Sequence, residues 1–383
     1  MSETVIVTGA RAPVAHDIAR SLRALGCNVH FADSARAWVA RTLHPRFAVH
    51  RLPPPRTEFD AFRRELLRLI GKTGATRVIP TCEEVFWLAE AARRDGFENA
   101  LFAPSPQTLR QLHSKAEFVE LAQECGLPVP ETIVLDRPIS DGALGAPDKL
   151  VFKPEFSRFA THTLIGPSAT QVAKIQPSET CRWVAQQRIQ GEEICSWSAV
   201  HKGKVTAFAA YRPRWRSGHS AAFQLESIDS PALLEASTRI AAATGMSGHL
   251  SFDAIRDPSA ETYLIECNPR AVSGLHLFDA ATPMAAAILG HEACDSPETG
   301  MLRHMGPAMA LLGVPMAIRR GQLKQLQSDW RASQDVIDRE GNPLVTLACL
   351  ADAASFALLA LRNSLSPAAA TTSDIEWNGA PIA

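Results

Sequence analysis

The sequence lacks an excess of charge of either sign. Its 39 Lys and Arg residues nearly balance 40 Asp and Glu residues, which gives a formal net charge of −1. A protein that binds nucleic acid or an anionic membrane through its overall charge carries a basic surplus. Neither nucleic acid nor membrane is therefore an expected partner.

Long apolar runs are also missing. The most apolar stretch, residues 345–361, contains Asp352 and is too short for a membrane span. Its apolar positions instead follow one face of a helix. The start, Met1–Gly9, has a strand pattern and not a charged and then apolar export signal, so the expected location is cytoplasmic. The helix-face residues are Leu347, Leu350, Ala354, Ala357, Leu358 and Leu361.

Closely spaced cysteine pairs are absent as well. No Cys-x-x-Cys occurs, and His291-Glu292 does not belong to an HExxH motif. Single cysteines inside apolar runs are typical of reduced core residues in a cytosolic protein, so zinc is not expected. The eight cysteines are Cys27, Cys82, Cys125, Cys181, Cys195, Cys267, Cys294 and Cys349.

At 383 residues, the chain is expected to form two or three domains. Residues 1–105 alternate predicted strands and helices, which favours a parallel sheet with helices packed on it. The first turn, TGARAPVA, has Ala12 and Val14 where the GxGxxG motif needs glycine. An NAD-dependent oxidoreductase is therefore not expected. The predicted strands cover 4–10, 27–34 and 76–81, and the helices 14–25 and 58–70.

Two acidic residues, Glu83 and Glu84, follow a predicted strand end in this region. Open α/β sheets bind ligands at such ends, so the pair can face a substrate. Acidic residues also favour the first turn of a helix, where they complement its dipole. Both interpretations stay open.

Residues 249–270 read HLSFDAIRDPSAETYLIECNPR and predict two antiparallel strands joined by a turn at Asp257-Pro258-Ser259. Asp253 lies on the first strand, and Glu266 and Asn268 lie two residues apart on the second. Carboxylate and amide oxygens are ligands that Mg²⁺ accepts. Arg270 adds a cation able to grip phosphate at two points.

This segment resembles the metal-binding hairpin of the ATP-grasp superfamily, of the type found in ADP-forming carboxylate–amine ligases, carbamoyl-phosphate synthetase and D-alanine–D-alanine ligase. The ending ECNPR is the most specific part of the resemblance. It implies ATP and Mg²⁺ as cofactors, with Mn²⁺ as a possible substitute. The implied metal ligands are Asp253, Glu266 and Asn268.

The resemblance extends to the nucleotide site. Lys115 in HSKAEF and Lys153 in LVFKPEFSRF match the two nucleotide lysines of the superfamily. In WVAQQRIQGEEICSWSAV, a connector that supplies the adenine edge is followed by a carboxylate for the ribose hydroxyls. The implied adenine residues are Gln186, Gln187 and Ile189, and the implied ribose residue is Glu193 or its neighbour Glu192.

The chain departs from the superfamily pattern after Lys153. Residues 155–163, EFSRFATHT, contain no glycine, whereas many ATP-grasp proteins place a glycine-rich loop over the phosphates. We expect the hydroxyls of Ser157, Thr161 and Thr163 and the cation of Arg158 to replace backbone amides as phosphate contacts there.

Three residues are candidates for catalysis. Arg270 follows the metal ligands, and Arg216 is the most promising of three arginines in YRPRWRSGHS. His276 lies close to the metal segment and is a candidate acid–base group. A histidine between Leu275 and Leu277 is also compatible with simple packing.

The implied fold is α/β, with a Rossmann-like domain (1–108), an ATP-grasp domain of α+β type (109–295, with subdomains 109–185 and 186–295) and a C-terminal extension (296–383). The implied activity joins a small carboxylate, activated as an acyl phosphate, to an amine, with release of ADP and phosphate. The partners are then small molecules, and a homodimer is compatible with the resemblance. The alternative is a regulatory MgATP-binding protein of the same fold.

Overall fold

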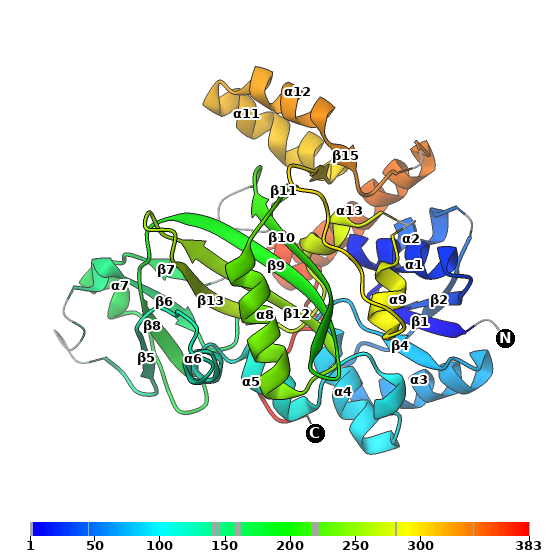
Figure 1. Cartoon of the computed structure of the whole chain (residues 1–383), viewed down its shortest axis with the longest axis horizontal. Helices are drawn as coiled ribbons and strands as arrows, with labels where there is room; N and C mark the ends of the chain where they lie inside the picture. Colours follow the sequence, from blue (N-terminus) through cyan, green and yellow to red (C-terminus); the bar gives the residue numbers. More distant parts are fainter. Residues whose placement is uncertain are drawn as a thin grey trace.

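The computed structural model describes residues 3–44, 46–139, 144, 146–157, 162–216, 222–279, 282–339 and 341–382. Figure 1 shows the chain as a mixed α/β protein in which helices cover three sheets. The predicted domain boundaries at residues 108 and 295 stay predictions. One apolar core cluster extends from α1 (Pro13–Ala24) through the sheet strand β9 (Glu192–His201) to α9 (Met284–Leu289).

The N-terminal sheet is parallel, as its strand–helix alternation predicts. Its four strands have the order β3-β2-β1-β4, so β1 lies inside the sheet. Val5, Ile6 and Val7 of β1 are fully buried, as expected for a strand covered on both faces. The elements are β1 (Thr4–Thr8), β2 (Asn28–Asp33), α2 (Trp38–Thr42), β3 (Ala48–Arg51), α3 (Phe59–Thr73), β4 (Arg77–Ile79), α4 (Glu84–Asp95) and α5 (Pro106–His113).

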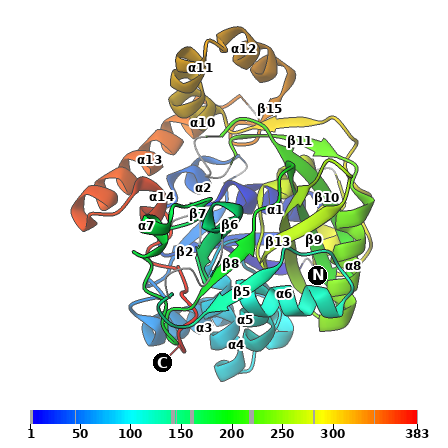
Figure 2. The ribbon, with the colours of Figure 1, turned by 90° about the vertical axis from the view of Figure 1, so that its left-hand side faces the viewer.

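A second, smaller sheet of four strands follows, with the order β5-β8-β6-β7 and antiparallel pairing throughout. Ser114 caps the start of the helix that comes before this sheet, because the Ser114 side chain accepts a hydrogen bond from the backbone N–H of Glu117. Figure 2 views this sheet from its own side. The elements are α6 (Lys115–Glu124), β5 (Thr132–Leu135), β6 (Leu150–Pro154), β7 (Leu164–Ile165), α7 (Ala169–Val172) and β8 (Trp183–Gln187).

The largest sheet has seven strands in the order β13-β12-β9-β10-β11-β14-β15. Its interior strand β9 pairs antiparallel with both β10 and β12. The helix α8 packs against these three strands, and Trp197 of β9 is fully buried. The remaining elements of this part are β10 (Lys204–Pro213), β11 (Gln224–Ile228), α8 (Pro231–Thr244), β12 (Gly248–Arg256), β13 (Thr262–Asn268), β14 (Leu302–His304) and β15 (Gln334–Asp335).

The C-terminal part is helical and includes a long apolar helix, α13 (Pro343–Asn363). It has a hydropathy of 2.1 and is the one helix of the described residues long and apolar enough to cross a membrane. The helix is longer at both ends than the apolar run 345–361 recognised in the sequence. Its predicted apolar face points to solvent, since Leu347 is 61% exposed and Leu361 80% exposed. The other helices here are α10 (Gly306–Ala308), α11 (Val314–Arg320), α12 (Leu323–Ala332) and α14 (Pro367–Ala370).

Hydrogen bonds at two places connect the C-terminal part to the N-terminal domain. The carboxylate of Asp352 on α13 accepts hydrogen bonds from the backbone N–H groups of Trp38 (2.9 Å) and Val39 (3.0 Å). After α14, residues 371–382 run back along α4 and α5, where the indole of Trp87 donates to the carbonyl of Ile375 at 2.8 Å. The last described residues therefore lie beside the first domain.

Candidate active site

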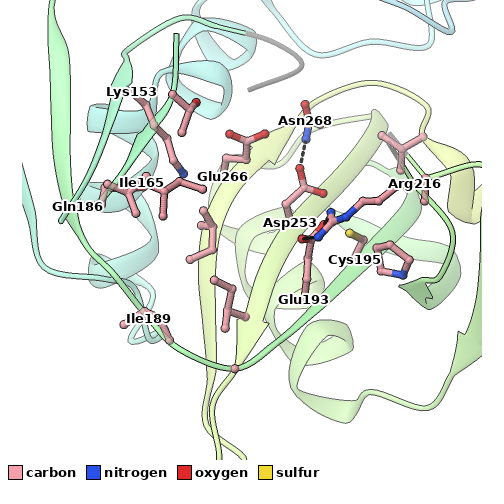
Figure 3. A pocket seen from close by; sticks show the side chains of 18 of the residues that line it. Lys153, Ile165, Gln186, Ile189, Glu193, Cys195, Arg216, Asp253, Glu266 and Asn268 are labelled. Carbon is pink, nitrogen blue, oxygen red and sulfur yellow. Dashed lines mark hydrogen bonds and ion pairs between the residues drawn. The ribbon is translucent and has the colours of Figure 1, made fainter. Parts of the chain in front are cut away.

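A cavity of about 530 Å³ is lined by residues of both antiparallel sheets. The small sheet contributes Lys153 and Gln186, and the large sheet contributes Asp253 and Glu266. Figure 3 shows Lys153 reaching from the small sheet towards Glu266. Charged groups that are remote in sequence thus meet in one place.

The predicted hairpin is present, and it gathers the proposed metal ligands. Asp253 lies directly opposite Glu266, and Ser251 lies opposite Asn268, in the antiparallel pairing of β12 with β13. Residues directly opposite each other place their side chains on the same face. The amide of Asn268 donates to the carboxylate of Asp253 at 3.1 Å. The three side chains therefore converge.

The electrostatics of this hairpin suit a cation. Burial, and then the charge of Glu266, raise the pKa of Asp253 to about 7. Burial also acts to raise the pKa of Glu266, but the ammonium groups of Lys115 and Lys153 hold it below its usual range. Two carboxylates buried side by side repel each other unless a proton or a cation lies between them.

The chemistry of the donor set fits magnesium. Within the described ranges, no group of three or more His, Cys, Asp or Glu side chains could hold a metal ion. The set proposed here has two carboxylates and one amide oxygen, which are hard oxygen donors that leave positions for phosphate oxygens.

The two lysines approach Glu266 from different elements. Lys153 lines the cavity, and burial lowers its pKa to about 8. Lys115 is only 3% exposed and lies behind the lining, with its Nζ 3.8 Å from Oε2 of Glu266. That ammonium group also donates to the carbonyls of Glu155 (3.4 Å) and Ser157 (3.3 Å). Lys115 is therefore fixed by the backbone at the root of the 155–163 segment.

The predicted adenine residues Gln186, Gln187 and Ile189 all line the cavity. The two candidate ribose carboxylates differ in their position relative to the cavity. Glu193 lines the cavity, whereas Glu192 is bound by the guanidinium groups of Arg212 and Arg256. Placement therefore favours Glu193.

Of the three clustered arginines, only Arg216 lines the cavity. Its guanidinium pairs with both carboxylate oxygens of Glu193, at 2.7 and 2.6 Å. Arg212 and Arg214 pair instead with Glu226. The structure thus separates one arginine of the site from two that link strands of the large sheet.

Arg270 also lines the cavity and joins the hairpin to the N-terminal domain. Its Nη2 donates to Oδ1 of Asn268 at 2.9 Å, and its Nε lies 3.9 Å from Oε1 of Glu83. Glu84 has a different position, because it accepts hydrogen bonds from the Thr8 hydroxyl and the Thr81 and Cys82 backbone N–H groups. Glu84 thus binds backbone groups just before α4, while Glu83 is fully buried and lies beside Arg270.

The structure does not bring His276 into the cavity. It is fully buried, and its Nδ1 lies 2.7 Å from Oδ2 of Asp17 on α1. Arg339 binds the same carboxylate. This arrangement fits the packing interpretation, and the catalytic role predicted for His276 has no support from its position.

Of the loop residues, Ser157 lines the cavity, and Arg158 lies outside the described residues. Sequence reasoning missed Cys195 and Tyr211, which also line it. Burial raises the pKa of both groups well above their usual values, so both stay protonated. Cys195 follows Glu193 by two residues on β9, and this period-two spacing was the available signal.

Comparison with known proteins gives matches in structure only. No protein-family profile and no curated protein matches the chain. An L-amino acid ligase from Bacillus licheniformis is similar over 75% of this chain and 74% of that chain, with 15% identity and a TM-score of 0.55. N5-carboxyaminoimidazole synthetase from Staphylococcus aureus, complexed with ADP, is similar over 84% of this chain and 87% of that chain, with 14% identity and a TM-score of 0.61.

A third similar structure is the biotin carboxylase domain of the Hydrogenobacter thermophilus 2-oxoglutarate carboxylase, in complex with MgADP. That match covers 79% of this chain and 73% of that chain, with 14% identity and a TM-score of 0.59. At such identities the likeness establishes the fold. The chain has the ATP-grasp fold that its sequence predicts.

Proposed function

We propose that this protein is an ADP-forming ligase that uses MgATP to join a small carboxylate, such as an amino acid, to an amine. The observation that carries the proposal is the convergence of Asp253, Glu266 and Lys153 on one cavity between two sheets. Three similar structures are an amino acid ligase, a synthetase with bound ADP and a carboxylase domain with bound MgADP. They support the same class of chemistry.

The chain's own residues have separate tasks in this proposal. Asp253, Glu266 and Asn268 would hold magnesium, or manganese in its place. When bound, the metal would neutralise phosphate charge and polarise the phosphoryl group. Lys115 and Lys153 balance the remaining charge, with Ser157 and Arg158 at the loop. Gln186, Gln187 and Ile189 surround the base, and Glu193 accepts from the ribose hydroxyls.

The reaction needs no protein nucleophile. A substrate carboxylate oxygen attacks the terminal phosphorus of ATP, so that an acyl phosphate forms and ADP leaves. The amine then attacks the acyl carbon, phosphate departs with the bonding electrons, and the proton that the amine loses passes to the departing phosphate. Arg270 and Arg216 position the anionic groups and stabilise the charge that develops on the transferred phosphoryl oxygens. Water hydrolyses an acyl phosphate, so the site has to exclude water while this intermediate is present.

The test is ADP and phosphate release from MgATP with a panel of amino acids and small carboxylic acids, with hydroxylamine added to trap acyl phosphate. We expect ADP release that depends on one carboxylate, together with its hydroxamate. ADP release without any hydroxamate would contradict acyl phosphate formation.

The glycine-free segment 155–163 favours a second candidate, a regulatory protein that binds MgATP without ligation. It predicts MgATP binding in calorimetry with no turnover for any acceptor. Failure to bind MgATP at all would reject both candidates.

A further inference from the structure

The C-terminal segment 371–382 reaches the root of the 155–163 segment through one aromatic cluster. The indole of Trp377 stacks on Phe86 at 4.7 Å between ring centroids, and it meets Phe156 edge-on at 5.3 Å. The ring of Phe156 also lies 5.8 Å from that of His113 and below the guanidinium of Arg110. Phe156 is thus enclosed by α5 and the C-terminal segment.

The chain turns closely around the same ring. Gly379 adopts a φ of +88°, and a Cβ at this position would lie 2.4 Å from the Phe156 ring. Arg110 donates to the carbonyl of Gly379 at 3.1 Å, and Trp377 Nε1 donates to the carbonyl of Ala380 at 2.7 Å. These bonds hold the segment against Phe156 and leave no room for a larger residue than glycine.

Phe156 stands between the two residues whose carbonyls hold the Lys115 ammonium group, Glu155 and Ser157. Glu155 is anchored on its other side, where its carboxylate accepts hydrogen bonds from Ser114 and Arg182. Hydrogen bonds from the Glu155 N–H to the carbonyl of Arg182 (2.9 Å) and from the Ser157 hydroxyl to the carbonyl of Pro154 (3.2 Å) also hold this short stretch of backbone. The packed ring of Phe156 adds a side-chain contact to them.

We propose that Trp377 is a positioning residue for nucleotide binding. By packing on Phe156, it fixes the Glu155 and Ser157 carbonyls, and these aim the Lys115 ammonium group at Glu266 and the nucleotide phosphates. The inference rests on the proposed use of MgATP. It gives a residue of the C-terminal extension a role in the site, although Trp377 does not line the cavity.

The experiment measures MgATP affinity by calorimetry for the wild type, Trp377→Ala and Trp377→Phe. We expect Trp377→Ala to weaken binding about 3- to 10-fold, the range that one aromatic contact gives, and Trp377→Phe to restore most of it. Trp38→Ala is the matched control, since Trp38 lies on α2 and does not line the cavity. Thermal unfolding identifies variants that are only less stable.

Hydrogen exchange of the peptide spanning residues 150–157 provides a readout without nucleotide. Faster exchange in Trp377→Ala, but not in Trp38→Ala, is expected. Wild-type affinity and unchanged exchange in Trp377→Ala would overturn the positioning role alone. A wild type that does not bind MgATP would overturn the proposed function instead, and with it any role in nucleotide binding.

Discussion

Asp253 and Glu266 lie directly opposite each other on β12 and β13, both partly buried, and two lysines lie within electrostatic reach of Glu266. Their geometry makes Glu266 the most informative position to change. Glu266→Gln should lower ADP formation at least about 100-fold, because it removes one anionic metal ligand without changing side-chain volume. The measurement is steady-state ADP release. Glu261→Gln, at an exposed position beside the same hairpin, should keep full activity, and equal losses in both variants would argue against the metal assignment.

Arg216 and Arg214 form a matched pair two residues apart, of which only Arg216 lines the cavity. Arg216→Ala should reduce kcat/KM at least about 10-fold, since it removes a cation from a site that handles phosphate and carboxylate. Arg214→Ala should leave kcat/KM within about 2-fold. Kinetics with saturating MgATP would test both variants, and a larger loss in Arg214→Ala would contradict the placement.

Glu84 is a buried structural carboxylate that accepts three hydrogen bonds at the ends of β1 and β4. Glu84→Ala should lower the free energy of unfolding by about 2–4 kcal/mol, because the Thr8 hydroxyl and two backbone N–H groups lose their acceptor. Urea unfolding measures the change. Glu58→Ala, just before α3 and exposed, is the control and should change stability by less than about 0.5 kcal/mol.

Two buried histidines should make stability depend on pH. Burial lowers the pKa of His249 to about 3 and that of His16 to about 4. In the unfolded chain these groups titrate near 6.5, so the unfolded state binds more protons between about pH 4 and 6.5. The free energy of unfolding should therefore fall as the pH drops through this window, while these groups contribute no pH dependence above it.

Urea unfolding at about pH 5 and about pH 7.5 tests this expectation. His249→Gln should reduce the difference between the two values, because it removes one of the groups that take up protons on unfolding. His44→Gln, at an exposed position, should leave the difference unchanged. An identical difference in the wild type and His249→Gln would contradict the assignment.

The sequence predicts the local parts of the site well. The period-two spacing of Glu266 and Asn268, the turn after Arg256 and the strand around Lys153 are short-range patterns, and the structure contains each of them. The sequence names Arg216 as the most promising of the three arginines and leaves Glu193 and Glu192 open, but it cannot show what separates the members of each pair. Those outcomes depend on partners such as Arg256 and Glu226 that reach the site from other strands.

His276 and α13 are two further places where tertiary contacts overrule a prediction made from local sequence. The spacing of His276 to the metal hairpin is short, but its direction is set by Asp17, which lies 259 residues earlier in the chain. In α13, one apolar stripe predicts a buried face, whereas tertiary contacts bury other positions, such as Val345, Ala348 and Ala360. Periodicity identifies a face without identifying what covers it.

The return of residues 371–382 to the N-terminal domain has a consequence for biosynthesis. The indole N–H of Trp87 on α4 bonds a carbonyl 288 positions later in the chain, and Phe86 stacks on a still later residue. During translation the first domain therefore leaves the ribosome with an aromatic surface that has no cover until most of the protein has been made. That interval is when a nascent chain is most open to chaperones and to aggregation.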